Sequence, residues 1–344
     1  MFWHPLLLAI FCAQIVALVL VLTAALTAFR TALHWQPHVP DSRQLALEAQ
    51  VAAASIQGRA AYGLWLFAAF LLVFGIANLF HHSIPGAMCG TGVFQAMSGS
   101  GSKLLLYLGV LLLLTHLWYA LDRLNGFQVD LPLTARNARL FLTLPPVALL
   151  TLIQTYQTFA AIVPYQPVDC CAVVYDQFHD LQQAESIIGL GDPWWLGFFL
   201  VLSLLLLGLG AANGFTTSDR PKIRLALAAV GTLWLPVAAL TLVNILSAYH
   251  YGVLQHHCPW CLFLPEHGLV GYPLYGAMVV IGMEGFTLFF LPPMVGKDFK
   301  SNGQVAKRCR QAAQRITFAG ATFLIITLGP PLFWRLRYGV WISG

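Results

Sequence analysis

Residues 198–209 read Phe-Phe-Leu-Val-Leu-Ser-Leu-Leu-Leu-Leu-Gly-Leu, and residues 104–114 read Leu-Leu-Leu-Tyr-Leu-Gly-Val-Leu-Leu-Leu-Leu. Each run lies inside a longer apolar stretch of about 20 residues, which is the length that a helix needs to cross a hydrocarbon core of roughly 30 Å. Backbone amides in lipid need partners within their own segment, and this favours helices over open strands. A transmembrane β-barrel would instead show alternating segments of about 10 residues. The runs therefore predict membrane-spanning helices.

The composition of the whole chain agrees with this interpretation. Of its 344 residues, 58% are hydrophobic and only 9% are charged, whereas a soluble domain carries about 25% charged residues. So few charges cannot cover a water-exposed surface of this size, but they can cover the two rims of a helix bundle in a lipid bilayer. We predict an all-α fold, a polytopic membrane helix bundle that forms a single integral membrane domain over residues 1–344. Its eight predicted transmembrane helices are approximately 5–29, 60–80, 104–121, 140–163, 194–215, 224–248, 268–292 and 314–334.

The basic residues indicate how these spans are oriented. Most of the Lys and Arg residues fall in four alternate loops: Arg30, Arg43, Arg59, Arg123, Arg136, Arg139, Arg220, Lys222, Arg224, Lys297, Lys300, Lys307, Arg308, Arg310 and Arg315. An excess of Lys and Arg marks the cytoplasmic side. We therefore expect a multi-pass protein of the cytoplasmic (inner) membrane, with both termini outside and the other three loops on the extracytoplasmic side. The formal charge of +5 does not indicate nucleic-acid binding, because the basic residues act as topology determinants.

The first cytoplasmic loop contains a local helix signal. Asp41-Ser42-Arg43-Gln44 resembles a capping box, and apolar residues follow it at Leu45, Leu47 and Val51. The stretch is compatible with an interfacial helix on the inner membrane surface or with a short docking helix that closes the bundle. We prefer the docking helix, separate from the span that begins near residue 60.

The third outer loop, about 249–267, carries the clearest chemical motif, His256-His257-Cys258-Pro259-Trp260-Cys261. A Cys-x-x-Cys pair in a helical turn places both sulfurs on one side, and such pairs cycle between dithiol and disulfide. We expect the next membrane helix to begin just after the motif, so that its N-terminal dipole favours a thiolate. The alternative is a structural disulfide or two unpaired thiols.

The other two outer loops add further sulfur and imidazole groups. The long loop 164–193 contains the neighbours Cys170 and Cys171, whose direct disulfide would be strained, so they are expected to pair with distant partners or to stay reduced. The loop 81–103 begins with His81-His82 and continues to Met88-Cys89. Glycines around Cys89 permit a tight backbone that places its sulfur near another group, although a lone Cys is often a buried small hydrophobe.

Three polar residues in the spans are candidates for a cofactor site. A carboxylate within a span, Glu284, is costly and is a functional candidate, unless it lies nearer the cytoplasmic rim. Gln157 and Asn244 lie near the outer ends of their predicted helices. They would face a quinone headgroup or a polar cavity, or they would hydrogen-bond between helices.

The segment Cys258-Pro259-Trp260-Cys261-Leu262-Phe263, just before a span, resembles the redox motif of the bacterial membrane disulfide-generating quinone reductases. The vitamin K epoxide reductase family uses a similar placement. The resemblance implies that Cys258 and Cys261 form the pair nearest a bound quinone, and that Cys170 or Cys171 is the exchanging partner in a second loop. Those families have a core of four or five helices, whereas this chain has eight predicted spans.

Three functions remain open at this point. The first is a membrane thiol–disulfide oxidoreductase that exchanges electrons between extracytoplasmic cysteines and a lipid-soluble carrier, with an extracytoplasmic protein thiol as partner. The second is the handling or delivery of copper or another soft metal, together with a metal-carrying partner. Thiolate, thioether and imidazole ligands suit such ions, and here they are His81, His82, Met88, Cys89, His256, His257, Cys258 and Cys261. The third is a haem-binding or structural subunit of a membrane electron-transfer complex.

Overall fold

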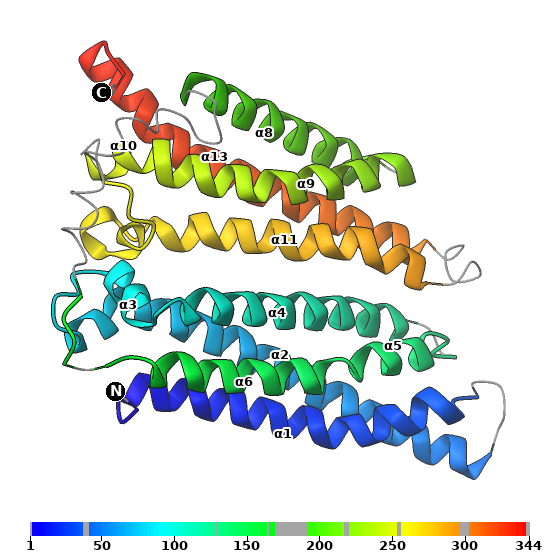
Figure 1. Ribbon diagram of the computed structural model, residues 1–344. Coiled ribbons are helices and arrows are strands. Elements are labelled where there is room, and N and C mark those ends of the chain that lie inside the picture. The colour runs from blue at the N-terminus through cyan, green and yellow to red at the C-terminus, as the bar shows by residue number, and fades with distance from the viewer. Residues whose placement is uncertain are drawn as a thin grey trace. The chain divides into compact units, whose positions relative to one another are not determined.

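We describe the protein from a computed structural model (Figure 1), which describes residues 2–36, 41–127, 130–163, 165–168, 192–216, 220–252, 256–295 and 303–341. Within these ranges the chain forms helices and no strand. Eight helical segments there are long and apolar enough to cross a membrane. The prediction of an all-α, multi-pass membrane protein is confirmed, whereas the outside location of both termini stays a prediction.

Residue contacts divide the chain into two compact units. The first unit comprises residues 1–75, 96–164 and 290–308, and the second comprises residues 76–95, 165–289 and 309–344. Four helices contribute residues to both units: α2 (Ser42–Asn78), α3 (Gly90–Ala96, through its last residue), α11 (Gly271–Met294) and α13 (Gln304–Tyr338). The single domain expected over residues 1–344 stays a prediction, and each unit is described by itself.

The first unit is built mainly from α1 (Pro5–His34), α2, α4 (Ser100–Asn125), α5 (Thr134–Phe141) and α6 (Leu144–Ala160). α4 packs against α6, and α1 packs against both α5 and α6. The predicted span 140–163 is divided between α5 and α6, with Pro145 in the first turn of α6. Proline lacks a backbone N–H and fits best in the first turn of a helix, so the two prolines at 145 and 146 account for the restart.

α2 differs from the expectation of a docking helix followed by a separate span. The structure has one continuous helix of 37 residues, which at 1.5 Å per residue is about 55 Å long and exceeds the hydrocarbon thickness. The prediction of two elements is wrong because no helix-breaking residue separates 42–59 from the apolar run. The charge at Arg59 is accommodated by an ion pair, in which its Nη2 lies 2.7 Å from Asp122 Oδ2 on α4.

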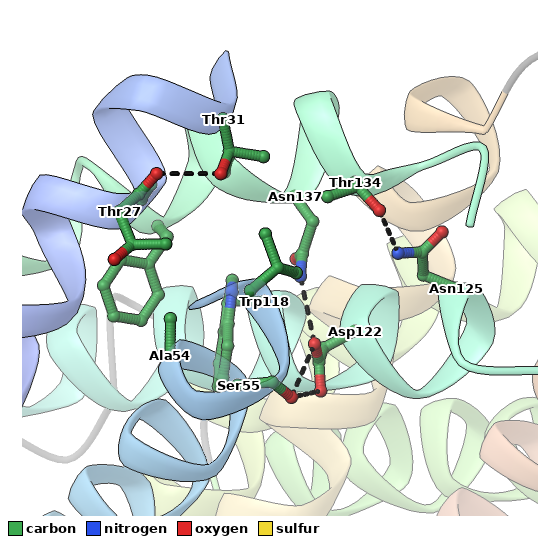
Figure 2. A pocket seen from close by; sticks show the side chains of 13 residues that line it. Thr27, Thr31, Ala54, Ser55, Trp118, Asp122, Asn125, Thr134 and Asn137 are labelled. Carbon is green, nitrogen blue, oxygen red and sulfur yellow. Dashed lines mark hydrogen bonds between the residues drawn. The ribbon is translucent and has the colours of Figure 1, made fainter. Parts of the chain in front are cut away.

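Asp122 is the centre of a polar network beside a small cavity in the first unit (Figure 2). Ser55 Oγ donates to both carboxylate oxygens, at 3.0 and 2.9 Å, and Asn137 Nδ2 donates to Oδ1 at 3.2 Å. The cavity has a volume of about 40 Å³, which is enough for one or two water molecules. These partners satisfy the buried carboxylate and join α2, α4 and α5.

The second unit contains the remaining helices. They are η1 (Phe80–Ser83), α3 (Gly90–Ala96), α8 (Asp192–Gly214), α9 (Pro221–Thr241), the π-helical η2 (Leu242–Leu246), α10 (Ser247–Tyr251), η3 (Cys261–Phe263), η4 (Pro265–His267) and most of α11 and α13. α8 packs along α9. Trp234 donates from Nε1 to Ser203 Oγ at 2.8 Å, and its ring lies edge-on to Phe323 at 4.9 Å. This apolar core holds α8, α9 and α13 together.

The charge pattern of α13 fits a membrane span. Its N-terminal part carries Lys307, Arg308, Arg310 and Arg315, and its C-terminal part carries Arg335 and Arg337. Residues 316–334 between them are uncharged and are about 28 Å long as a helix, close to a hydrocarbon core of roughly 30 Å. Directly before that uncharged segment, Arg315 Nη1 lies 2.6 Å from Glu284 Oε1 on α11.

Candidate thiol centre

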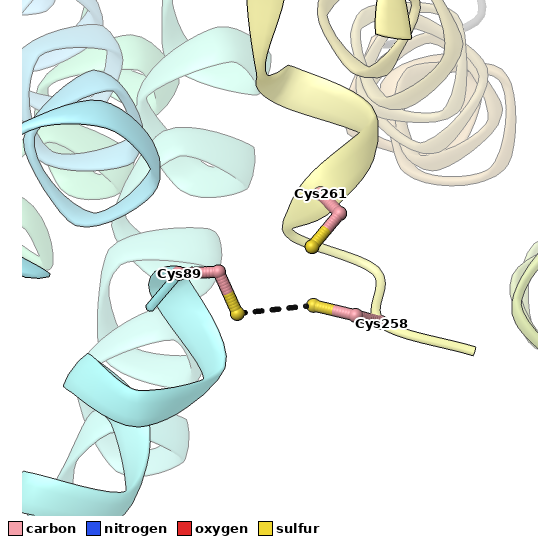
Figure 3. Close-up of side chains that lie close together, drawn as sticks. All are labelled: Cys89, Cys258 and Cys261. Carbon is pink, nitrogen blue, oxygen red and sulfur yellow. Dashed lines mark hydrogen bonds between the residues drawn. The ribbon is translucent and has the colours of Figure 1, made fainter. Parts of the chain in front are cut away.

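Three cysteines of the second unit bring their sulfur atoms together (Figure 3). Cys89 comes from the connection after α2, and Cys258 and Cys261 come from the connection between α10 and α11. The three Sγ atoms lie within 4.8 Å of one another, and Cys89 Sγ lies 3.5 Å from Cys258 Sγ. No disulfide joins any two of these three sulfurs. The structure thus adds a third sulfur to the Cys-x-x-Cys pair.

Two glycines, each in close contact with another segment, fix the part of the chain that carries Cys89. Gly86 has a positive φ of 78°, and a Cβ there would collide with the carbonyl oxygen of Val168. A Cβ on Gly90 would lie 2.6 Å from Cγ of Trp260, inside the Cys-x-x-Cys motif. Only glycine permits an approach this close. The missing side chain at Gly90 lets Trp260 lie against the start of α3, and this contact positions Cys89 next to the motif.

The motif itself adopts a turn followed by a short 3-10 helix. Pro259 and Trp260 form the turn, and Cys261 begins η3, with Leu264 N donating to Cys261 O at 3.1 Å. α11 begins only at Gly271. The expectation that a membrane helix begins just after the motif is wrong, because η3 and η4 lie between them. A helix dipole acts within the first turn, so the dipole of α11 does not account for a thiolate at Cys258.

The three thiols are shielded from solvent. Cys89 and Cys258 are each 5% exposed and Cys261 is 6% exposed. Tyr251, Trp260 and Leu264 pack against them, and the Trp260 ring in turn lies 5.1 Å from that of Phe94. Tyr251 also donates from its hydroxyl to the carbonyl oxygen of Cys258 at 2.5 Å. A large reactant therefore reaches the sulfurs only if this aromatic cover opens.

Hydrogen bonds make the thiol of Cys258 more acidic than that of Cys261. The bond with the Cys261 thiol, followed by that with Cys89, lowers the pKa of Cys258 well below the ordinary value, although burial acts in the opposite direction. Thr91 contributes through its Oγ1, which lies 2.9 Å from the Cys258 sulfur. The same bond with Cys258 raises the pKa of Cys261. The centre therefore holds its first negative charge on Cys258, and two neighbouring thiols donate to it.

The histidines and the methionine predicted as metal ligands lie outside this sulfur cluster. Among the described His, Cys, Asp and Glu residues, only the three cysteines form a group of possible ligand atoms within 4.8 Å. His257 Nδ1 lies 3.1 Å from the carbonyl oxygen of Val243, and the His256 ring lies edge-on to Tyr251 at 4.5 Å. Burial, followed by the charges of His267 and His257, lowers the pKa of His256 and favours its neutral form.

The other predicted ligands lie in the segment before Cys89. His81 and His82 lie with their ring centroids 4.0 Å apart. The pKa of His81 is lowered by burial and then by its neighbour His82. Met88 is 68% exposed, so its thioether lies on the surface although it directly precedes the buried Cys89.

The three polar residues that were predicted as a cofactor site lie in different environments. Gln157 is exposed on α6, and Asn244 is exposed with its Nδ2 donating to Leu240 O at 2.8 Å. Glu284 is 2% exposed and is paired with Arg315. It follows Gly271, the first residue of α11, by 13 positions, which corresponds to about 20 Å along a helix. Gln157 belongs to the first unit, and within the second unit neither Asn244 nor Glu284 is part of the sulfur cluster.

Two further predicted site residues, Cys170 and Cys171, lie outside the described residues, as does most of the predicted loop 164–193. His116, a buried histidine of α4 in the first unit, has a partner, since its Nδ1 lies 2.8 Å from the Tyr62 hydroxyl. Sequence reasoning missed Thr91 and Tyr251 as contacts of Cys258. The glycines around Cys89 were the sequence feature that indicated a close approach near Thr91. No sequence feature indicated that Tyr251 contacts Cys258.

No protein-family model, curated protein or solved structure matches this chain. The fold and the site therefore define it by themselves as a multi-pass helical membrane protein with a buried centre of three cysteine thiols in its second unit.

Proposed function

We propose that this protein is a membrane thiol–disulfide oxidoreductase, in which Cys258 forms a disulfide alternately with Cys261 and with Cys89. The observation that carries this proposal is the 3.5 Å contact between the sulfurs of Cys89 and Cys258, beside the Cys-x-x-Cys pair. A disulfide has an S–S distance of about 2.05 Å. A side-chain movement of roughly 1.5 Å is therefore sufficient to form the Cys89–Cys258 disulfide.

The third thiol allows an internal exchange. Starting from a Cys89–Cys258 disulfide, the thiolate of Cys261 attacks the Cys258 sulfur, the Cys258–Cys261 bond forms, and Cys89 leaves as a thiolate. This step moves the disulfide and changes no oxidation state. Cys258 is common to both disulfides, which agrees with its central hydrogen-bonding position and its lowered pKa.

The net reaction needs an electron acceptor, and we propose a lipid-soluble quinone. Two thiols of the centre lose two electrons and two protons to form a disulfide, and one quinone becomes one quinol. A substrate dithiol then reduces this disulfide by exchange and becomes a disulfide itself. Because the three thiols are buried, contact with a protein dithiol falls to Cys170 or Cys171, which pass the exchange to the centre.

The proposal is tested on the reduced, purified protein in lipid nanodiscs treated anaerobically with a water-soluble ubiquinone analogue. We expect quinol formation and a disulfide from Cys258 to Cys89 or Cys261, identified by non-reducing peptide mapping. Cys309→Ser, which alters another buried cysteine, serves as the matched control and should behave like the wild type. If all three thiols remain free to react with an alkylating agent after an excess of quinone, the proposal fails.

We further propose that the cysteine-bearing segments face the extracytoplasmic side of the cytoplasmic membrane, as the distribution of Lys and Arg predicts. Met88 is exposed next to Cys89, and Arg220 is exposed at the start of α9, so cysteines introduced there are accessible. A membrane-impermeant maleimide on intact cells, followed by peptide mapping, should modify the introduced cysteine of Met88→Cys and leave the introduced cysteine of Arg220→Cys unmodified. The reverse pattern would place the thiol centre on the cytoplasmic side.

A further inference from the structure

The sulfur cluster has the composition and spacing of a metal site as well as of a redox centre. Three thiols approach one another from two segments that are 169 positions apart in the sequence, and all three are buried. An ion bound in the plane of three sulfurs at about 2.3 Å separates the sulfurs by about 4.0 Å. The Cys89–Cys258 sulfur separation is 3.5 Å and none of the three separations exceeds 4.8 Å, so a small adjustment of the side chains is sufficient to reach this value.

We propose that the reduced centre binds one Cu(I) ion through the sulfurs of Cys89, Cys258 and Cys261 in trigonal geometry. Binding changes no oxidation state, because copper enters and stays as Cu(I), and each thiol that becomes a ligand releases a proton to solvent. This site is distinct in composition from the mixed sulfur and imidazole set that the sequence indicates, since no histidine nitrogen belongs to the cluster in the described residues.

The number and softness of the three sulfur ligands indicate the ion. Thiolates favour Cu(I), Zn(II) and iron–sulfur clusters, but structural zinc is almost always bound by four ligands in a tetrahedron. Among the described His, Cys, Asp and Glu residues, the group that can hold an ion consists of three cysteine sulfurs. Three soft ligands are sufficient for Cu(I), which does not require a tetrahedron.

The surroundings also disfavour water as a fourth ligand. Tyr251, Trp260 and Leu264 pack on the three cysteines, and the apolar shell of a metal site controls the access of solvent. Thr91 is within hydrogen-bonding distance of the Cys258 sulfur, so its hydroxyl can donate to a thiolate and offset part of the negative charge that three thiolates leave around a monovalent ion.

The inference is independent of the proposed oxidoreductase activity, although the two compete for the same thiols. Copper held by all three sulfurs blocks formation of a disulfide, and a disulfide removes two of the three ligands. The metal measurements therefore use the fully reduced protein without quinone, so that their result does not depend on electron transfer.

The test is an anaerobic titration of the reduced, purified protein with the Cu(I)–bicinchoninate complex. We expect one Cu(I) per chain to move to the protein, and X-ray absorption to show three sulfur neighbours at about 2.3 Å. Cys89→Ser should lower the Cu(I) affinity at least about 100-fold, whereas the matched control Cys309→Ser should retain it. Zn(II) in the same assay should bind at least about 100-fold more weakly than Cu(I).

Several results would overturn the inference. One is a wild-type protein that takes no more Cu(I) than the triple variant Cys89→Ser/Cys258→Ser/Cys261→Ser. Others are a spectrum with two or four sulfur or nitrogen neighbours, or Zn(II) binding as tight as Cu(I). The wild-type spectrum needs no substituted protein, so the test does not depend on whether the variants fold. Copper binding without quinone reactivity would contradict the proposed function alone, and quinone reactivity without copper binding would contradict this inference alone.

Discussion

Asp122 in the first unit and Cys258 in the second are both buried groups that can carry a negative charge, and they have different partners. The Asp122 carboxylate accepts hydrogen bonds from Ser55 and Asn137 and pairs with Arg59. The Cys258 sulfur contacts two other thiols and the hydroxyl of Thr91. A carboxylate satisfied by a cation and fixed donors stabilises a fold, whereas a sulfur surrounded by sulfurs can form a new bond. Burial alone therefore does not distinguish a structural group from a reactive one, but the chemistry of its neighbours does.

The largest expected effect comes from removing the sulfur at the centre of the cluster. Cys258→Ala leaves Cys89 and Cys261 without their common partner, so quinone reduction should fall to the background rate, while thermal unfolding in detergent changes little. The corresponding change in the first unit, Asp122→Ala, should leave quinone reduction intact. If Cys258→Ala still reduced quinone, the assignment of a reactive role to Cys258 and a structural role to Asp122 would be contradicted.

The acidity of Cys258 should appear in its reaction with a small alkylating agent. Since the folded pKa of Cys258 is lowered, its thiolate persists below the pH at which an ordinary thiol is protonated, and reactivity is lost only as the pH falls through the lowered value. Cys261→Ala removes the largest cause and should shift the rate profile to higher pH, with about a tenfold lower rate at pH 6 for each unit by which the raised pKa exceeds 6. The measurement is the alkylation rate of Cys258 by mass spectrometry between pH 4 and 9. A folded-state profile identical to that of the urea-unfolded chain would contradict the hydrogen-bonding pattern.

The structural role of Asp122 should appear as a loss of stability. Asp122→Ala removes hydrogen bonds to a charged group, each worth about 1.5–3 kcal/mol, but Arg59 is partly exposed and can turn to water. We expect the free energy of unfolding to fall by about 2–3 kcal/mol in total. Unfolding of the detergent-solubilised protein by denaturant measures this free energy. Asp122→Asn is a second variant, for which we expect a smaller decrease. Unchanged stability together with lost thiol chemistry would reverse the roles assigned to the two units.

The smallest effect is expected at the glycine that positions Cys89. Gly90→Ala places a Cβ against Trp260, and overpacking of this kind costs about 1–3 kcal/mol. We expect the free energy of unfolding to fall by an amount near the lower limit of this range. We also expect faster alkylation of Cys89 and Cys258, because Trp260 moves away from them. Gly109→Ala, where a Cβ meets nothing within 4 Å, is the matched control and should be neutral or slightly stabilising. Equal alkylation rates in both variants would show that Trp260 does not cover the thiols.

Much of the fold could be predicted because membrane helices are specified locally. The length of each apolar run predicts a span, since backbone hydrogen bonds in lipid close within the same segment. The first part of α2 was wrongly predicted as a separate docking helix because a polar stretch at the end of a helix and a polar loop look alike in the sequence. The predicted span 268–292 begins three residues before α11, but the expected effect of its dipole on Cys258 was wrong because η3 and η4 separate the motif from the helix.

The sequence by itself determined the eight apolar spans and the presence of a Cys-x-x-Cys motif in one connection. Only the tertiary structure decided that Cys89 joins this motif and that His256, two positions from Cys258, does not join the cluster. The physical reason is that neighbours along an irregular segment can point in different directions. Distant residues, in contrast, meet wherever packing such as that of Gly90 against Trp260 brings their backbones together.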